Sequence, residues 1–121
     1  MAYLNTLVLD NGLSVLTSNA DRLDICVTEP TTYAEATSTY TLGNSAVMVG
    51  SPEARGGGGR KVVVGAIAAG NVTATDTAAY WALTDGTSVL YAVGSLSAPQ
   101  TVTSGNTFTL TAIDIGIPGL A

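Results

Sequence analysis

The sequence predicts a mainly β protein, and three observations support this fold class. A chain of 121 residues is long enough for one hydrophobic core and too short for two. In the second half, apolar and polar residues alternate over short segments, which is typical of half-buried strands. Turn residues separate these segments at intervals of roughly 8 to 12 residues. We therefore expect a single domain over residues 1–121, a small β-sandwich or barrel with a C-terminal meander and a short N-terminal helix.

The helix is predicted near the N-terminus, where apolar residues recur at helical spacing: Leu9, Leu13 and Leu16. Asp10 is a suitable N-cap and Asn19 can end the helix, so we expect it to cover about residues 10–18. A hairpin is the alternative, because Asn11-Gly12 is a strong two-residue turn signal.

The next segment reads as a strand followed by one helical turn. Three apolar residues alternate with polar residues or cysteine and predict a strand with one half-buried face: Leu23, Ile25 and Val27. Cys26 then falls on the opposite face, and Glu29-Pro30 closes the strand. Thr32 and Glu35 have capping-box spacing, which predicts a helical turn or an ordered loop. Residues 38–49 read as irregular to strand-like, with a break at Gly43-Asn44.

A Gly-rich loop is expected over residues 51–61, where Pro52 and the run Gly56–Gly59 give the backbone great freedom. Residues 61–68 follow as a strand that is apolar almost throughout and therefore covered on both faces. Together with an N-terminal arm of about residues 1–6, the loop is the expected flexible part of the domain.

The C-terminal half predicts a β-meander. Strands over residues 79–84 and 88–96 flank Asp85-Gly86 and form a hairpin. Residues 101–103, a turn at 104–106 and a strand over 107–115 repeat this pattern.

Composition disfavours catalysis. The chain has no histidine and one cysteine, and charged residues make up 11% of it, against roughly a quarter in an average domain. General acid/base, nucleophilic and metal chemistry depend mostly on these residue types, so we expect no enzyme activity, no catalytic residues, no metal and no cofactor. The net charge of −5 also disfavours nucleic acid and anionic membranes as partners.

Individual polar and aromatic residues are interpreted mainly as structural. Cys26 has no histidine to activate it and is expected to be a partly buried packing residue. The acidic residues of the first 30 positions lack the spacing of a calcium loop and are interpreted as isolated surface carboxylates: Asp10, Asp21, Asp24 and Glu29. The aromatic rings of the hairpin are expected in the core or at a subunit interface, with a sugar-binding face as the alternative: Tyr80, Trp81 and Tyr91.

Three of the four basic residues lie within seven positions: Arg55, Arg60 and Lys61. A phosphate loop is disfavoured, because neither serine nor threonine follows Lys61 and the chain continues as a strand. A basic loop on an acidic protein can dock an acidic patch of a partner, and a merely solvated loop is an equally weighted alternative.

Two stretches, Ile25–Thr37 and the C-terminal strands Ala78–Leu83 and Val102–Ile115, resemble small virion proteins of tailed phages and prophages. The resemblance implies a head decoration, or cement, protein. Such proteins are small, β-rich, commonly trimeric and free of catalytic groups, and they clamp neighbouring capsomers on the capsid exterior. A neck or tail component is the alternative within this class, and a host-surface carbohydrate-binding module is the alternative outside it.

From this resemblance we expect the chain to bind the major capsid protein and to form a homo-oligomer, with a trimer favoured. The candidate capsid contacts are two residues of the arm and three of the basic loop: Tyr3, Leu4, Arg55, Arg60 and Lys61. The N-terminus lacks a basic region followed by an apolar segment, and no stretch approaches the length of a membrane span. We therefore expect synthesis in the host cytoplasm, and the resemblance implies a final location on the capsid surface of the virion.

Overall fold

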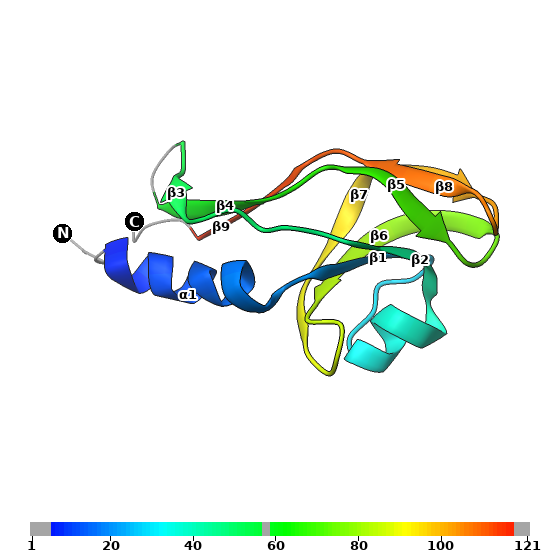
Figure 1. The fold of residues 1–121 in the computed structure, drawn as a ribbon, viewed down its shortest axis with the longest axis horizontal. Coiled ribbons are helices and arrows are strands. Elements are labelled where there is room, and N and C mark those ends of the chain that lie inside the picture. The colour runs from blue at the N-terminus through cyan, green and yellow to red at the C-terminus, as the bar shows by residue number, and fades with distance from the viewer. Residues whose placement is uncertain (1–5, 57–58, 118–121) are drawn as a thin grey trace.

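A computed structural model of the protein describes residues 6–56 and 59–117. Strands make up 53% of the chain and form two antiparallel sheets, which confirms a mainly β, sandwich-like domain with an N-terminal helix. Figure 1 shows the helix α1 (Thr6–Asn19) and the three-stranded sheet at one end, and the six-stranded sheet at the other. The strands are β1 (Arg22–Cys26), β2 (Thr41–Ala46), β3 (Glu53–Ala54), β4 (Arg60–Val64), β5 (Ile67–Val72), β6 (Asp76–Thr84), β7 (Leu90–Val102), β8 (Thr107–Leu110) and β9 (Ile113–Ile117).

The N-terminal segment is a helix, and the alternative hairpin at Asn11-Gly12 is wrong. The helix begins at Thr6 rather than near Asp10, so Asp10 lies inside it and is not its N-cap. Leu13 and Leu16 are buried in the main core, which fixes the helix against the small sheet. Helical burial of these leucines outweighs the local turn preference of Asn-Gly.

β1 lies in the middle of the six-stranded sheet, whose order is β7-β6-β1-β2-β5-β8. Its residues from Leu23 to Cys26 are all at most 1% exposed. The prediction of one half-buried face is therefore wrong, because Leu23 and Ile25 face the main core while η1 (Glu35–Thr39) covers Cys26 on the opposite face. Asp24 is likewise buried, so its interpretation as a surface carboxylate is wrong.

The six-stranded sheet is curled. Its edge strands β7 and β8 are consecutive in the chain and are joined by a turn in which the Asn106 amide donates to the Thr103 carbonyl, 3.0 Å away. A flat sheet would hold its edges about 24 Å apart, whereas the five residue steps from Val102 to Thr107 span at most about 17 Å. The sheet must therefore bend until its two edges approach each other.

The hairpin prediction is confirmed, and the meander prediction holds only in part. β6 and β7 pair antiparallel across Asp85-Gly86, where Gly86 adopts a φ of +74°. β8, however, pairs with β5 and not with β7. The local turn signal identifies a change of direction but not the strand that the chain pairs with next.

Two predicted strands are each divided between the two sheets. The apolar run 61–68 forms β4 in the small sheet, crosses at Gly65-Ala66 and continues as β5 in the large sheet. Buried and more exposed residues alternate along this run, so the prediction that both of its faces are covered is wrong. The run 107–115 is divided in the same way into β8 and β9. These crossings join the two sheets around one core.

Gly43-Asn44 does not interrupt a strand but lies inside β2. A Cβ atom on Gly43 would lie 2.5 Å from the carbonyl oxygen of Asn71, so glycine allows β2 and β5 to approach closely. The helical turn predicted at Thr32 and Glu35 is present, but only half of the capping box forms. The Glu35 amide donates to Thr32 Oγ1 at 3.1 Å, whereas the Glu35 carboxylate accepts from the amide of Thr31 at 2.8 Å.

Candidate functional site

The three basic residues of the Gly-rich segment are carried by a short hairpin of the small sheet. β3 and β4 pair through Glu53 with Lys61 and Ala54 with Arg60. The Arg55 amide donates to the Gly59 carbonyl at 3.2 Å and extends this pairing toward the tip. The segment predicted as a loop therefore has a defined backbone on both sides of the tip.

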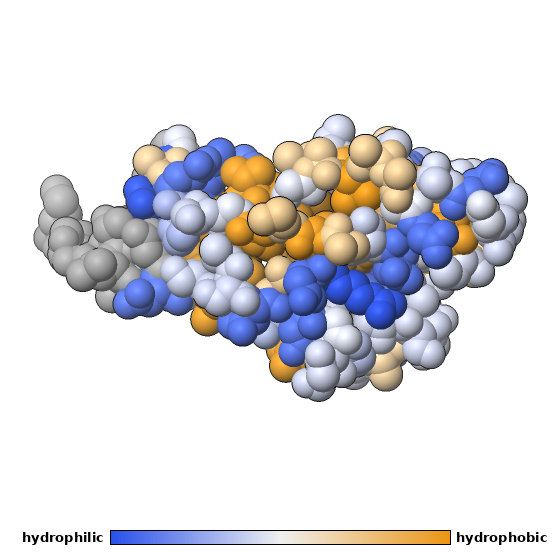
Figure 2. Space-filling model, in the orientation of Figure 1, coloured by the Kyte–Doolittle hydropathy of each residue, from blue (hydrophilic) through white to orange (hydrophobic). Residues whose placement is uncertain are grey.

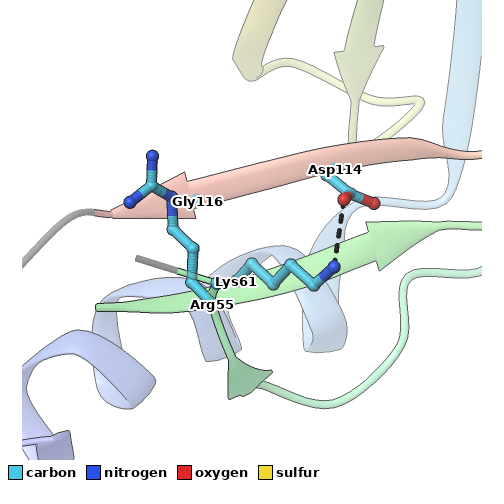
Figure 3. Close-up of a pocket in the computed structure, with 5 residues that line it drawn as sticks. Arg55, Lys61, Asp114 and Gly116 are labelled. Carbon is cyan, nitrogen blue, oxygen red and sulfur yellow. Dashed lines mark hydrogen bonds and ion pairs between the residues drawn. The ribbon is translucent and has the colours of Figure 1, made fainter. Parts of the chain in front are cut away.

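The hairpin divides the basic side chains between two faces of the sheet. Arg60 stands opposite Ile117 on the face that α1 covers, and its Nη2 donates to the Pro52 carbonyl at 3.3 Å. Lys61 and Arg55 lie on the outer face, where Arg55 extends over Gly116 of β9 (Figure 3). Of the three basic residues that are close in the sequence, only Arg55 and Lys61 are therefore on the same face of the sheet.

Acidic residues accompany Lys61. Its Nζ lies 3.0 Å from Asp114 Oδ2 and 3.8 Å from Glu53 Oε1. The hydrogen bond that Lys61 donates to the Asp114 carboxylate raises the pKa of Lys61. Because these groups are solvent-exposed, the pairs orient the side chains but contribute little stability.

Arg55 and Lys61 line a shallow hollow of about 380 Å³ together with Gly56, Asp114 and Gly116. It offers cations beside a carboxylate and backbone polar groups, which suits a polar or charged segment of another protein. We interpret the hollow as a contact surface.

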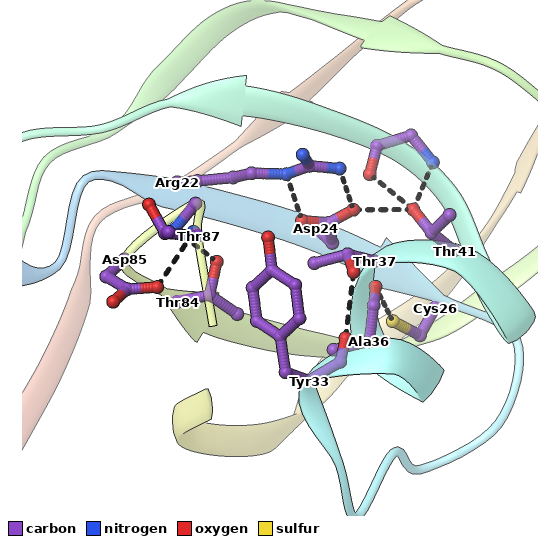
Figure 4. A network of polar contacts seen from close by, with 12 residues as sticks. Arg22, Asp24, Cys26, Tyr33, Ala36, Thr37, Thr41, Thr84, Asp85 and Thr87 are labelled. Atoms are coloured by element: carbon purple, nitrogen blue, oxygen red, sulfur yellow. Dashed lines mark hydrogen bonds and ion pairs between the residues drawn. The ribbon is translucent and has the colours of Figure 1, made fainter. Parts of the chain in front are cut away.

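The sequence did not lead us to predict a buried polar network that is centred on β1. Arg22 Nε and Nη2 donate to the two carboxylate oxygens of Asp24 at 2.8 and 3.1 Å, and Thr41 Oγ1 donates to Asp24 Oδ2 at 2.7 Å (Figure 4). The available signal was an arginine two residues before an aspartate on the same face of a strand. The network satisfies a carboxylate inside the fold, so its role is structural.

Cys26 is buried beneath η1, and its thiol donates to the Ala36 carbonyl over 3.6 Å. Burial, with a smaller effect of the nearby Asp24 charge, raises the pKa of the thiol to about 12. Such a thiol stays protonated at neutral pH, which fits packing and not nucleophilic chemistry. Within the described residues, no group of three or more His, Cys, Asp or Glu side chains could hold a metal ion.

The aromatic side chains of the central hairpin do not form an exposed platform. Trp81 is 9% exposed, and its ring lies on Gly94, where a Cβ would approach Cε2 to 2.5 Å. Tyr80 and Tyr91 are partly buried and pack against core clusters. The prediction of core packing is confirmed for Trp81.

Apolar surface lies elsewhere. Figure 2 shows hydrophobic residues gathered over the middle of one face, between the two ends of the molecule. Met48 is 84% exposed, and its carbonyl accepts a hydrogen bond from Gly65 at the crossing between the sheets. An exposed methionine beside a sheet crossing is suited to packing against another protein.

Two of the predicted contact residues, Tyr3 and Leu4, lie outside the described residues, as does most of the predicted arm. Among the described helices, none has the length and apolar character needed to cross a membrane. Comparison with protein-family models, curated proteins and solved structures finds no match. The functional argument therefore depends on the geometry of the chain itself.

Proposed function

We propose that this protein is a non-enzymatic structural component of a phage virion that binds the capsid exterior as a decoration protein. The observation that carries the proposal is the outer face of the small sheet, where Arg55 and Lys61 project from an otherwise acidic chain. Because Asp114 and Glu53 lie beside Lys61, the face has mixed charge, and a surface of the major capsid protein that carries both acidic and basic side chains would complement it. The resemblance to small phage virion proteins supplies the identity of the partner.

The exposed apolar surface supports an assembly role. Met48 and the hydrophobic residues at the middle of the molecule would be covered on binding. Each Å² of apolar area removed from water would contribute about 25 cal/mol to the free energy of binding. Individual contacts of this kind are weak. Repetition over the symmetric sites of a shell makes them collectively strong.

A host-surface carbohydrate-binding module is the second candidate function, and the aromatic residues argue against it. Sugar recognition by stacking needs an aromatic face open to solvent, whereas Trp81 lies in the core. We expect acrylamide to quench Trp81 fluorescence weakly in the folded protein, with no change on adding glycans. Efficient quenching that glycans suppress would favour the carbohydrate-binding function.

Co-sedimentation with expanded, undecorated capsids of the parent phage tests the proposal. We expect saturable binding at a stoichiometry set by the capsid's symmetry sites, and weaker binding of the variants Arg55→Glu and Lys61→Glu. Glu29→Lys, a change at an exposed loop residue, is the control with altered charge away from this face. An absence of binding to intact shells would refute decoration and favour a neck or tail location.

A further inference from the structure

The small sheet has one edge with which no described strand pairs. β9 pairs with β4 on one side only, and the order of this sheet is β3-β4-β9. The edge strand contains no proline, lysine or bulge, which commonly block edge pairing, and its one charged residue is Asp114.

Hydrogen bonds made by β4 and the residue after it establish which backbone groups of β9 face outward. Gly50 donates to the Val63 carbonyl and Gly65 donates to the Met48 carbonyl, each at 2.9 Å, so Val63 and Gly65 direct their polar groups away from β9. Because these directions alternate along a strand, Val62 and Val64 face β9 and bond with their partners Ile115 and Ile113. The amide and carbonyl groups of Asp114 and Gly116 therefore point outward from the free edge.

We propose that two copies of this chain pair antiparallel along the free edges of β9, related by a two-fold axis at Ile115. In this register Asp114 of each copy stands opposite Gly116 of the other, and each such pair exchanges two backbone hydrogen bonds. The two Ile115 side chains meet on the face that α1 partly covers. The three-stranded sheet becomes one continuous six-stranded sheet.

Charge complementarity selects this register. Arg55 passes over Gly116 of its own copy, since a Cβ there would lie 2.9 Å from Arg55 Cδ. The Cα atom of Asp114 in the second copy would lie about 5.5 Å from the Cα atom of Gly116, directly across the new strand pair, and its side chain would be on the same face of the sheet. Its carboxylate would thus lie beside the Arg55 side chain while keeping Lys61 of its own copy as a neighbour. Each dimer contains this contact twice.

The pairing is tested on the isolated protein without capsids, and Arg55 takes part both in it and in the proposed capsid contact. It yields a dimer, in place of the trimer that the family resemblance implies. Sedimentation equilibrium should show a concentration-dependent species of twice the monomer mass. A protein that stays monomeric up to about 1 mM would overturn the proposal.

Charge-reversal variants test the register. Asp114→Lys and Arg55→Glu each place two like-charged contacts in the dimer and should weaken it at least about tenfold. Mixing the two variants should restore association, because the heterodimer contains one Lys–Glu and one Arg–Asp contact. Glu29→Lys, with the same charge change as Asp114→Lys, should dimerise normally. Variants that dimerise as the wild type does, or that fail to associate when mixed, would contradict the proposal.

Hydrogen exchange on the unmodified protein gives a readout that needs no variant. The outward amides of Asp114 and Gly116 should exchange faster on dilution into the monomer range. The inward amides of Ile113 and Ile115 are bonded to β4 and should respond much less. Equal behaviour of the four amides on dilution would overturn the pairing.

Discussion

Arg22 and Asp24 form a two-point ion pair within a single strand, with both carboxylate oxygens of Asp24 accepting from the guanidinium at 2.8 and 3.1 Å. The Asp24 side chain is fully buried, whereas that of Arg22 is 30% exposed. The arginine therefore reaches from the surface to neutralise a charge inside the fold. Thr41 on β2 supplies a further donor and links the pair to the neighbouring strand.

Removing Arg22 should be more damaging than removing both charges. Arg22→Ala leaves the Asp24 carboxylate buried and still accepting a hydrogen bond from the Thr41 hydroxyl, and we expect a loss of about 3 kcal/mol in the free energy of unfolding. Adding Asp24→Asn removes the uncompensated charge, so the double variant should be more stable than Arg22→Ala alone. Urea denaturation of the two single variants and the double variant measures this coupling. Additive losses would show that the pair is not coupled.

Gly94→Ala should destabilise the fold through Trp81. The new methyl group would lie 2.5 Å from the indole ring and force it to shift, at a cost of about 1–3 kcal/mol. Urea denaturation followed by tryptophan fluorescence reports both the stability and the environment of the ring. Gly56→Ala is the matched control, because no atom of the described residues beyond its chain neighbours lies within 4 Å of the added methyl group. Equal stability of the two variants would contradict the packing described for Trp81.

Cys26 should resist thiol reagents until the protein unfolds. Its side chain is buried, and its pKa is raised to about 12, so neither access nor ionisation favours reaction at pH 8. The rate of labelling by a thiol-specific reagent should rise with urea in parallel with global unfolding. Rapid labelling of the native protein would show that η1 opens locally and exposes the thiol.

Acid should weaken the hairpin turn between β6 and β7. The Asp85 carboxylate accepts hydrogen bonds from the amides of Val89, Ser88 and Thr87, which lower its pKa from the usual value of 3.8. The ionised group stabilises the fold above the unfolded-state pKa, and this contribution disappears as pH falls through the lower folded-state pKa. Melting temperatures between about pH 5 and about pH 2 should therefore fall less steeply for Asp85→Asn than for the wild type. Identical slopes would contradict this role.

The elements predicted correctly are those that local signals determine. Strand alternation and the Asp85-Gly86 turn identify the β6–β7 hairpin, and Thr32 with Glu35 identifies the start of η1. Each of these signals acts between residues that are close in the chain. Long-range pairing does not alter them.

The errors arise where distant strands decide the outcome. Asp24 looks exposed by alternation, but β1 lies in the middle of a sheet and receives cover from elements distant in sequence. Gly43 looks like a strand breaker, but the close approach of Asn71 requires a glycine there. The candidate site was also predicted only in part. Side chains alternate between the two faces along β4, so Arg60 lies on one face while Arg55 and Lys61 lie on the other, beside β9. The prediction grouped these three basic residues only because they are close in the sequence.

The central claim is that this protein stabilises a capsid by binding its exterior, and the thermal stability of the shell tests it most directly. Expanded, undecorated capsids should be melted with increasing amounts of the wild-type protein or of Lys61→Glu. We expect the melting temperature of the shell to rise and to saturate when the binding sites are filled, with a smaller rise for the variant. A shell whose melting temperature is unchanged at saturating protein would contradict the claim.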